Sequence, residues 1–203
     1  MRKTGARRAP GRPRSQEADS AILSAALDLM IERGAGRTSI EQVAQRAGVT
    51  RATVYRRFPD KTTLLIQAIE AEHRDHDPGA PDWPDLSLMV HDMASYLSRP
   101  RHRRMLRRLY GAVDDHPELL RSYRDSQGGR RASAELATLA RARDEGRLPP
   151  DTNPEILQQI LNGAILHHLG AYPDTVTAAD ISAFFIAVLK QTGYDQGRQR
   201  AAR

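Results

Sequence analysis

Apolar residues recur at helical spacing along nearly the whole chain, and the most informative set lies in its first third. This set, spaced i, i+3, i+4 and i+7, comprises Ile40, Val43, Ala44 and Ala47. Thr38 and Glu41 have the spacing of a capping box at the start of the helix that the set predicts. Gly48 tolerates the positive φ of a sharp turn, and Thr50 is placed to cap a second helix over residues 51–57. This is the outline of a helix-turn-helix, whose second helix enters the DNA major groove.

The second of these helices carries side chains suited to DNA. They are cationic or form hydrogen bonds, and they belong to Arg51, Thr53, Tyr55, Arg56 and Arg57. An ordinary αα-corner would need the same glycine and the same apolar positions. A solvated face more usually mixes acids with bases, however, and no acid occurs here before Asp60. The side chains therefore favour a helix that reads DNA over a packing corner.

Periodicity and capping residues predict the other helices. Their expected ranges are 16–33 with Ser15 as cap, 61–74 with Asp60 as cap, 85–98, 100–113, 117–146, 154–172 after Asn153, and 178–193 after a Thr177–Asp180 capping box. Gly128 and Gly129 predict a kink or break in the long helix over 117–146. The proline-rich stretch 75–85 predicts a domain boundary, with Trp83 expected to anchor onto the following domain rather than to contact a ligand.

Composition and charge narrow the partners. The net charge is +6 and the isoelectric point is near 10.0, which indicates that the binding partner is a polyanion. No apolar run approaches the length of a membrane span, and the absence of cysteine excludes disulfides and fits a cytoplasmic location. No nucleophile elbow, phosphate loop or zinc signature occurs, and His73 with His76 lack a third metal ligand. We therefore expect no catalysis, no cofactor and no metal.

Residues 21–70 resemble the DNA-binding domain of the TetR (AcrR-like) family of bacterial transcriptional regulators. The matching residues are Ile22, Ala26, Gly34, Thr38, Ile40, Val43, Ala44, Ala47, Gly48, Val49, Thr53, Val54, Tyr55, Phe58, Lys61, Leu64 and Leu65. The resemblance implies an all-α fold, in which a three-helix, homeodomain-like helix-turn-helix domain precedes a larger helical domain for ligand binding and dimerisation. The expected divisions are a disordered basic arm (1–16), the DNA-binding domain with the start of the connecting helix (17–76), the ligand-binding and dimerisation domain (77–195) and a frayed tail (196–203).

The resemblance also assigns the DNA contacts. Base-edge contacts are expected from Thr50, Arg51 and Thr53, because arginine can be bidentate to guanine and a threonine methyl can meet thymine. Contacts to phosphates, which position the protein without specifying a sequence, are expected from Thr38, Tyr55, Arg56 and Lys61. Tyr55 also suits a half-buried position with an exposed hydroxyl.

The arm over 1–16 is rich in arginine and has no acid. Its segment 10–14 resembles an AT-hook core, in which Arg12 and Arg14 would lie in a narrow A·T minor groove. A solvated tail that adds non-specific phosphate contacts is the other interpretation, and both stay open.

Apolar stripes in the last two predicted helices are expected to form a homodimer surface, since in the family these helices pair with those of a second subunit. The proposed interface residues are Ile156, Ile160, Ile181, Phe184, Phe185 and Val188. The plainer alternative is that the stripes face their own domain. A twofold dimer would hold two recognition helices roughly 34–36 Å apart and favour a palindromic operator.

The ligand pocket of relatives lies between the middle helices and the penultimate helix of the second domain. The corresponding lining residues are Met93, Tyr96, Leu97, Met105, Leu109, Tyr110, Tyr123, Asn162, Leu166 and His167. Asn162 and His168 also suit satisfied interior polar groups. The arginines of residues 101–108 have two interpretations, a solvated face with ion pairs to nearby acids or a site for an anion.

Together these features predict a sequence-specific, DNA-binding transcriptional regulator, a repressor that an unknown small-molecule effector releases. The alternative is an architectural protein that coats A·T-rich DNA without an effector. A third class, an enzyme or carrier on a helical scaffold, would need a polar cleft with converging acids or bases. The expected partners are double-stranded DNA, a second copy of the chain and the effector, and no membrane.

Overall fold

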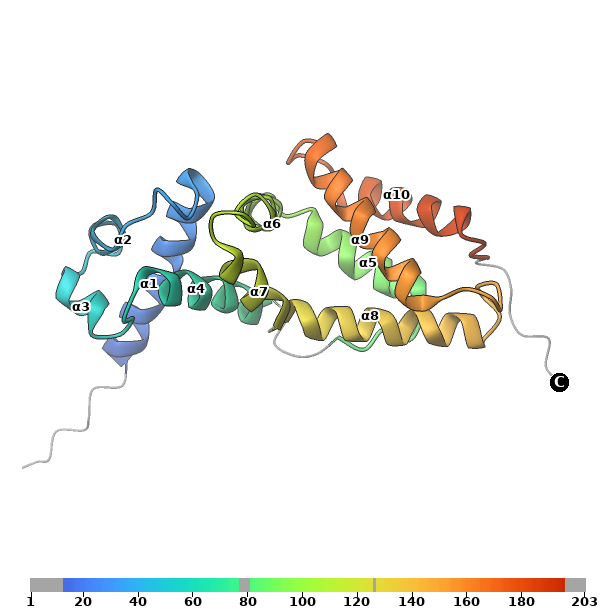
Figure 1. Ribbon diagram of the computed structural model, residues 1–203, viewed down its shortest axis with the longest axis horizontal. Coiled ribbons are helices and arrows are strands. Elements are labelled where there is room, and N and C mark those ends of the chain that lie inside the picture. The colour runs from blue at the N-terminus through green and yellow to red at the C-terminus, as the bar shows by residue number, and fades with distance from the viewer. Residues whose placement is uncertain (1–12, 77–80, 126, 196–203) are drawn as a thin grey trace, which may run out of the picture.

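This computed structural model describes residues 13–76, 81–125 and 127–195 of the chain. This part of the chain contains ten helices and no strands (Figure 1). They are α1 (Pro13–Arg33), α2 (Ile40–Arg46), α3 (Arg51–Tyr55), α4 (Lys61–His76), α5 (Leu86–Leu97), α6 (Pro100–Tyr110), α7 (Pro117–Asp125), α8 (Gln127–Asp144), α9 (Pro154–Ala171) and α10 (Ala178–Gln191). The expected all-α fold is confirmed. Residues 1–12 of the predicted arm, residues 77–80 and the predicted tail lie outside the described residues, whereas residues 13–16, also assigned to the arm, belong to α1.

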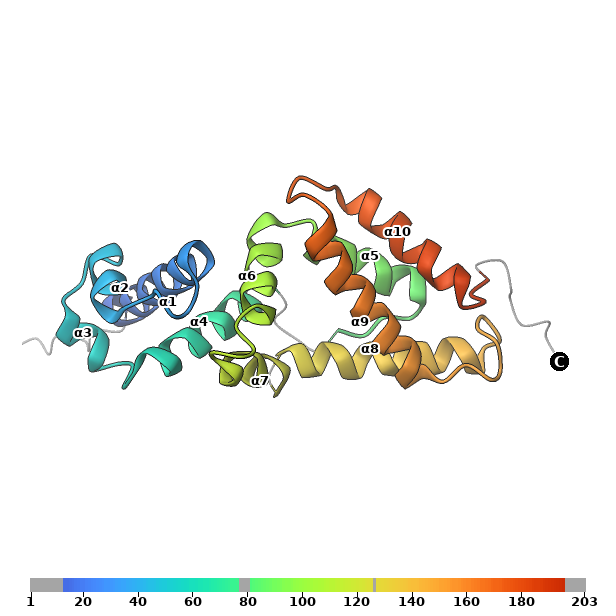
Figure 2. The same cartoon turned by 45° about the horizontal axis from the view of Figure 1, so that its top comes forward.

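Helix α1 is the support of the N-terminal end. It packs against α2, α4 and α6, and α2 packs against α3. Figures 1 and 2 show α1, α2 and α3 gathered at one end of the molecule, with α4 leading from them toward the remaining helices. Each helix turns an apolar stripe inward, and the residues that this buries completely include Ile22, Val43, Val54 and Leu64.

The start of α2 differs from the sequence prediction. Ser39 is the N-cap, because its hydroxyl accepts from the Gln42 amide at 3.3 Å while the Gln42 side chain accepts from the Ser39 amide at 3.1 Å. Thr38 is buried instead, and its hydroxyl donates to the Gly34 carbonyl at 2.9 Å. The predicted Thr38–Glu41 box is therefore wrong by one residue, since two pairs of the same spacing overlap and the burial of Thr38 selects the second.

The other N-terminal boundaries are mostly as predicted. Gly48 makes the turn with φ +67°, Thr50 caps α3, and Asp60 accepts from an amide in the first turn of α4 at 2.7 Å. Helix α1, however, begins at Pro13, because proline is well suited to a first helical turn. Ser15 is therefore inside the helix and is not its cap.

The C-terminal helices form a second packed group. Helix α10 packs against α5, and α9 packs against α8, α10 and α6. Figures 1 and 2 show α9 lying between α8 and α10, while α6 and α7 lie toward the N-terminal helices. The caps at Asn153 and the Thr177–Asp180 box are where the sequence predicts them, and Asp85, expected as the first residue of its helix, is the N-cap of α5.

The stretch expected as one long helix over 117–146 contains two helices, α7 and α8. Gly128 and Gly129 lie in the first turn of α8. A Cβ atom on Gly128 would lie 2.7 Å from the carbonyl oxygen of Tyr123 and 2.9 Å from its ring. The absence of a side chain therefore allows α8 to start directly beside the end of α7.

Candidate DNA-binding surface and effector cavity

Helix α3 presents a short, polar surface. Thr50 Oγ1 accepts from the Thr53 amide at 3.2 Å and lies 2.9 Å from Thr53 Oγ1, so the cap fixes both hydroxyls at the start of the helix. The Arg51 side chain is 59% exposed and forms an ion pair with Glu41 at 2.8 Å. Its guanidinium lies 5.5 Å from the centre of the Tyr55 ring, and this tyrosine is 44% exposed. Three side chains predicted to contact bases thus start one exposed turn.

Arg57, unlike the neighbouring Arg51 and Arg56, points into the fold and binds α1. Its Nε forms an ion pair with Asp19 of α1, and its Nη1 donates to the Thr53 carbonyl at 3.2 Å. Arg56 is exposed instead. Arg57 therefore fastens the end of α3 to α1 and fixes the direction in which α3 presents its side chains.

The predicted phosphate contacts fall into two groups. Tyr55 and Arg56 are exposed, whereas Lys61 is half-buried and donates to the Ala35 carbonyl at 3.1 Å. Thr38 is 2% exposed and its hydroxyl is already bonded, so it offers no free hydroxyl to a phosphate in this structure. Arg12 lies outside the described residues.

A cavity of about 620 Å³ lies among α5 to α9 in the second group of helices. It is lined by seven of the ten predicted residues, namely Met93, Tyr96, Leu97, Tyr110, Tyr123, Asn162 and Leu166. The assignment of Met105 and Leu109 to the lining is wrong, because both are almost completely buried in the core on another face of α6. His167 is also outside the lining; it is exposed, with its ring edge-on to Tyr172.

The sequence prediction missed several residues of the cavity wall. Trp83, expected only as an anchor, is buried, donates to Asp92 at 3.2 Å and also lines the cavity. Arg131 and Glu135 of α8 face it as well. Their i, i+4 spacing places them on one face of a helix, which was the available signal.

Arg131 is held between aromatic rings. Its guanidinium lies 5.3 Å from the ring centres of both Trp83 and Tyr96, within cation–π range. Its Nη2 also forms an ion pair with Asp92 at 2.8 Å. Burial raises the pKa of Tyr123 to about 12, so its phenol stays protonated at neutral pH. The cavity wall is thus aromatic, with polar groups at fixed places.

Comparison with known families decides the identity. Residues 22–68 match the family described as bacterial regulatory proteins, tetR family, and residues 83–187 match the family described as tetracyclin repressor-like, C-terminal domain. The chain belongs to the TetR family. It is a DNA-binding transcriptional regulator, and regulators of this family are typically repressors with ligand-binding C-terminal domains.

Individual relatives agree with this assignment. The uncharacterized HTH-type transcriptional regulator YdeS of Bacillus subtilis is 26% identical over 165 residues, which are 78% of this chain and 81% of YdeS. NalD of Pseudomonas aeruginosa, the secondary repressor of the MexAB-OprM multidrug efflux pump, has a similar fold (TM-score 0.65, 24% identity, 91% of this chain and 100% of NalD). So does SmeT in complex with triclosan (TM-score 0.66, 24% identity, 89% of this chain and 93% of SmeT).

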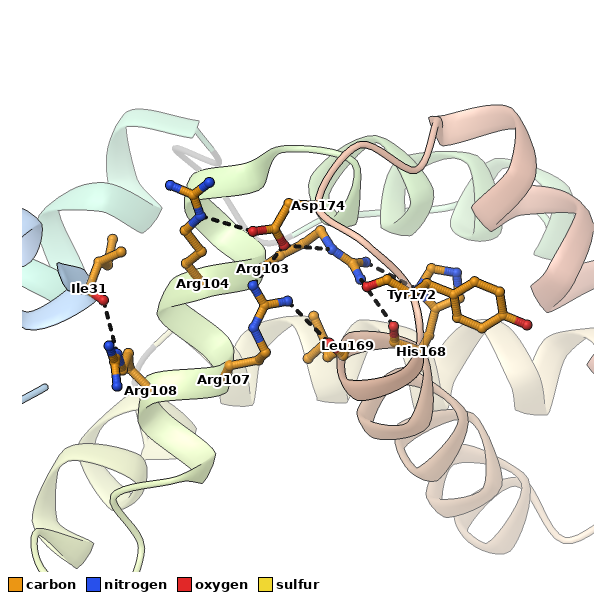
Figure 3. Close-up of polar contacts among 9 residues, drawn as sticks. All are labelled: Ile31, Arg103, Arg104, Arg107, Arg108, His168, Leu169, Tyr172 and Asp174. Carbon is orange, nitrogen blue, oxygen red and sulfur yellow. Dashed lines mark hydrogen bonds and ion pairs between the residues drawn. The ribbon is translucent and has the colours of Figure 1, made fainter. Parts of the chain in front are cut away.

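In this TetR-family chain, α6 joins the two groups of helices through its arginines. On the face of α6 that meets the C-terminal group of helices, Arg103 is fully buried. Its Nη2 donates to the carbonyls of His168 at 3.0 Å and Tyr172 at 2.9 Å (Figure 3). Arg104 and Arg107 bind the Asp174 carboxylate at 2.9 and 2.7 Å. The loop after α9 is therefore clamped onto α6.

His168 is a satisfied interior group, as predicted. Burial and the positive charge of Arg103 lower its pKa, so the ring is neutral at pH 7. Arginine has no acceptor, and the 3.1 Å contact is therefore a donation from Arg103 Nη1 to His168 Nδ1.

Other arginines of α6 bind the N-terminal group of helices in the same way. Arg108 donates to the carbonyls of Ile31 and Glu32 at 2.9 and 3.0 Å, and Figure 3 shows the first of these contacts reaching across to α1. Arg101 forms ion pairs with Asp28 of α1 and with Glu72 of α4, the latter at 3.0 Å. Ion pairs with nearby acids, as one interpretation expected, thus occur for Arg101, Arg103, Arg104 and Arg107, whereas Arg108 binds main-chain carbonyls.

Glu72 also connects α4 with the cavity. His102 Nε2 lies 3.5 Å from its Oε1, and the His102 ring stacks on Tyr96 with 4.2 Å between ring centres. Burial raises the pKa of Glu72, but hydrogen bonds from His102 and Arg101 outweigh it, so the pKa is about 2. The charged Glu72 carboxylate of α4 is thus linked through His102 to Tyr96, a residue of the cavity wall.

The predicted dimer residues separate into two sets. Ile181 and Phe185 are fully buried in the core of their own chain, so their assignment to the interface is wrong. Ile156 and Ile160 of α9 are 53% and 46% exposed. Phe184 and Val188 are half-buried. An apolar strip on the outer sides of α9 and α10 therefore remains uncovered.

The described part of the chain lacks two further features. None of its helices is long and apolar enough to cross a membrane. No group of three or more potential metal-binding side chains occurs in it either. His73 and His76 lie in α4, but their side chains are outside this description.

Proposed function

We propose that the protein is a dimeric repressor that reads a palindromic operator with α3 and leaves it when a small molecule fills the 620 Å³ cavity. The observation that carries this function is α3 itself, a capped and exposed turn held by Arg57 against α1. A protein that coats DNA non-specifically needs cations but no such fixed turn. In support of a small-molecule site, SmeT, which has a similar fold, has been solved with triclosan.

Arg51 and Thr53, with Thr50, are the proposed base contacts, and Tyr55, Arg56 and Lys61 the proposed phosphate contacts. Arg51 is exposed but bound to Glu41 at 2.8 Å. Binding of Arg51 to a guanine therefore requires it to leave or share this acid. Arg12 and Arg14 stay proposed minor-groove contacts.

Replacing Arg51 with alanine is expected to relax base preference at one position of each half-site, at a cost of about 1–3 kcal/mol in operator affinity. Footprinting on promoter fragments first defines the operator. Anisotropy titrations then compare this operator with a random duplex of the same length at one salt concentration.

The matched control is Arg56→Ala on the same helix. It removes a proposed phosphate contact and should weaken operator and random duplex about equally. If Arg51→Ala also weakens both duplexes equally, Arg51 is not a specificity residue. If the unaltered protein protects no fragment and gives only broad, salt-labile binding, the repressor proposal fails.

The structure supports a route for release. A ligand beside Tyr96 would press on the ring that stacks against His102, and His102 contacts Glu72 of α4. Helix α4 begins at Lys61, directly after the recognition turn. The ligand acts only by binding one spacing of the two recognition helices better than the other, and movement of α4 relative to α6 would change that spacing.

A double-mutant cycle on Arg101 and Glu72 tests whether α6 and α4 are energetically joined. Arg101→Ala, Glu72→Gln and the double variant are compared by chemical unfolding. We expect a coupling of about 1 kcal/mol at pH 7, reduced because Arg101 is partly exposed and screened.

The pH dependence of this coupling has a defined sign. The Glu72 pKa is lowered from its ordinary 4.5 to about 2, so the stabilisation is complete above pH 4.5 and is lost as the pH falls toward 2. A coupling near zero at pH 7, or one that grows on acidification, would contradict the proposed joint.

A further inference from the structure

One acidic side chain in the cavity wall is not explained by the contacts of the fold. Glu135 lines the cavity and is 7% exposed. Its Oε2 accepts from Gln158 Nε2 at 3.3 Å, but its Oε1 is buried and has no hydrogen-bond partner in the described part of the chain. Buried carboxylate oxygens are normally bonded, so this atom lacks a donor that a ligand could supply.

The cations near the cavity do not fill this role. Arg131 is committed to the Asp92 carboxylate at 2.8 Å and to two aromatic rings. Arg124 also lines the cavity but is an exposed residue. No ion pair between Glu135 and any cation occurs among the residues that the structure places. Glu135 is therefore a buried ionisable group of the wall that has a hydrogen bond on one oxygen but no ion pair among the described residues.

The rest of the wall suits a flat apolar body. The rings of Trp83, Tyr96, Tyr110 and Tyr123 line the cavity together with Met93. Aromatic faces attract cations as well as other rings, and Arg131 shows this by stacking between two of them. An aromatic body beside these rings and a donor at Glu135 are thus compatible in one molecule.

We propose that the cavity takes an effector with a flat aromatic body and one protonated nitrogen, whose N–H donates to Glu135. This inference rests on the proposed effector site and names the class of molecule that it selects. An anionic effector is disfavoured, because Arg131 is already neutralised by Asp92, Arg124 is exposed to solvent, and the remaining charged group of the wall is a buried acid.

The electrostatics of the cavity wall agree with this assignment. Burial raises the pKa of Glu135 to about 7, although the Gln158 hydrogen bond and the charge of Arg131 act in the opposite direction. The isolated carboxylate is thus poorly stabilised by its surroundings. A cation placed beside it would favour the ionised form.

Three probes of the same shape test the proposal, namely anthracenylmethylamine, anthracenylmethanol and anthracene carboxylate. Trp83 is the only tryptophan of the chain and lines the cavity, so quenching of its fluorescence reports occupancy. We expect the amine to bind at least about tenfold more tightly than the alcohol or the acid, because its hydrogen bond to the carboxylate is charge-assisted. Equal binding of the three probes, tighter binding of the acid, or no binding of the amine overturns the proposal.

The variant Glu135→Gln keeps the shape of the side chain and removes its charge. It should weaken the amine by about tenfold or more and change the alcohol by less than about threefold. Glu155→Gln, which alters an exposed acid in the first turn of α9 outside the cavity, is the matched control. An amine preference that survives Glu135→Gln overturns the role of Glu135. If this variant does not fold, the probe series on the unaltered protein still decides.

Operator binding is measured on the same preparations without probe. Loss of probe selectivity with intact operator binding overturns this inference alone. Absence of operator binding overturns the repressor proposal, whatever the probes do.

Discussion

Replacing Arg103 with alanine is expected to lower the free energy of unfolding by about 3–5 kcal/mol. The side chain is fully buried, and its guanidinium serves the carbonyls of His168 and Tyr172, the His168 ring and the Asp174 carboxylate. Removing it leaves His168 Nδ1 and the Tyr172 carbonyl without their donor, which costs more than the lost contacts themselves, while the Asp174 carboxylate keeps Arg104 and Arg107. Chemical denaturation at pH 7 measures the change.

Arg104→Ala is the matched control, since Arg104 is one position along α6 and binds the same Asp174. Its side chain is 56% exposed, and Arg107 continues to bind Asp174 at 2.7 Å when it is removed. We expect a loss below about 1 kcal/mol. Similar losses for the two variants would mean that the buried arginine stabilises the fold no more than a surface ion pair does.

Changing Ile160 to glutamate is expected to separate the proposed dimer and weaken operator binding by about 10²–10⁴-fold. Ile160 is 46% exposed on the outer side of α9, so a charge there costs little in the monomer but would be buried without a partner between two subunits. A single subunit then holds one half-site instead of two. Sedimentation at micromolar concentration and operator titration give the two readouts.

Val113→Glu serves as its control, because Val113 is 47% exposed in the turn after α6, away from α9 and α10. It should leave both the mass in solution and the operator affinity unchanged. A monomeric unaltered protein, or an Ile160 variant that stays dimeric, would place the subunit contact elsewhere or remove it.

Local signals were sufficient for most of the fold. Thr50, Asn153 and the Thr177–Asp180 pair start helices through contacts within one turn, so their spacing alone predicted the starts of α3, α9 and α10. Where two local signals overlap, the sequence is ambiguous. Thr38 and Ser39 start capping boxes of the same spacing, and only the burial of Thr38 and its hydrogen bond to the Gly34 carbonyl distinguish them.

The candidate sites were harder to predict, because they depend on which face each helix turns to its neighbours. Met105 and Tyr110 lie on one helix and looked equally suitable as lining residues, but Met105 is in the core and Tyr110 lines the cavity. The same applies to α10, whose Ile181 and Phe185 face their own chain. No feature of the arginine run indicated that Arg103 alone would be fully buried. Such choices follow from the relative rotation of helices, which nearest neighbours along the chain do not encode.

Five of the acceptors that the α6 arginines use are main-chain oxygens, those of Ile31, Glu32, His168, Leu169 and Tyr172. A carbonyl is present whatever side chain the residue carries. The side chain at an acceptor position such as Ile31 can therefore change during evolution without breaking these bonds, whereas the arginines cannot. The linkage between the two ends of the molecule would then survive in lineages whose sequences no longer show matched pairs of opposite charge.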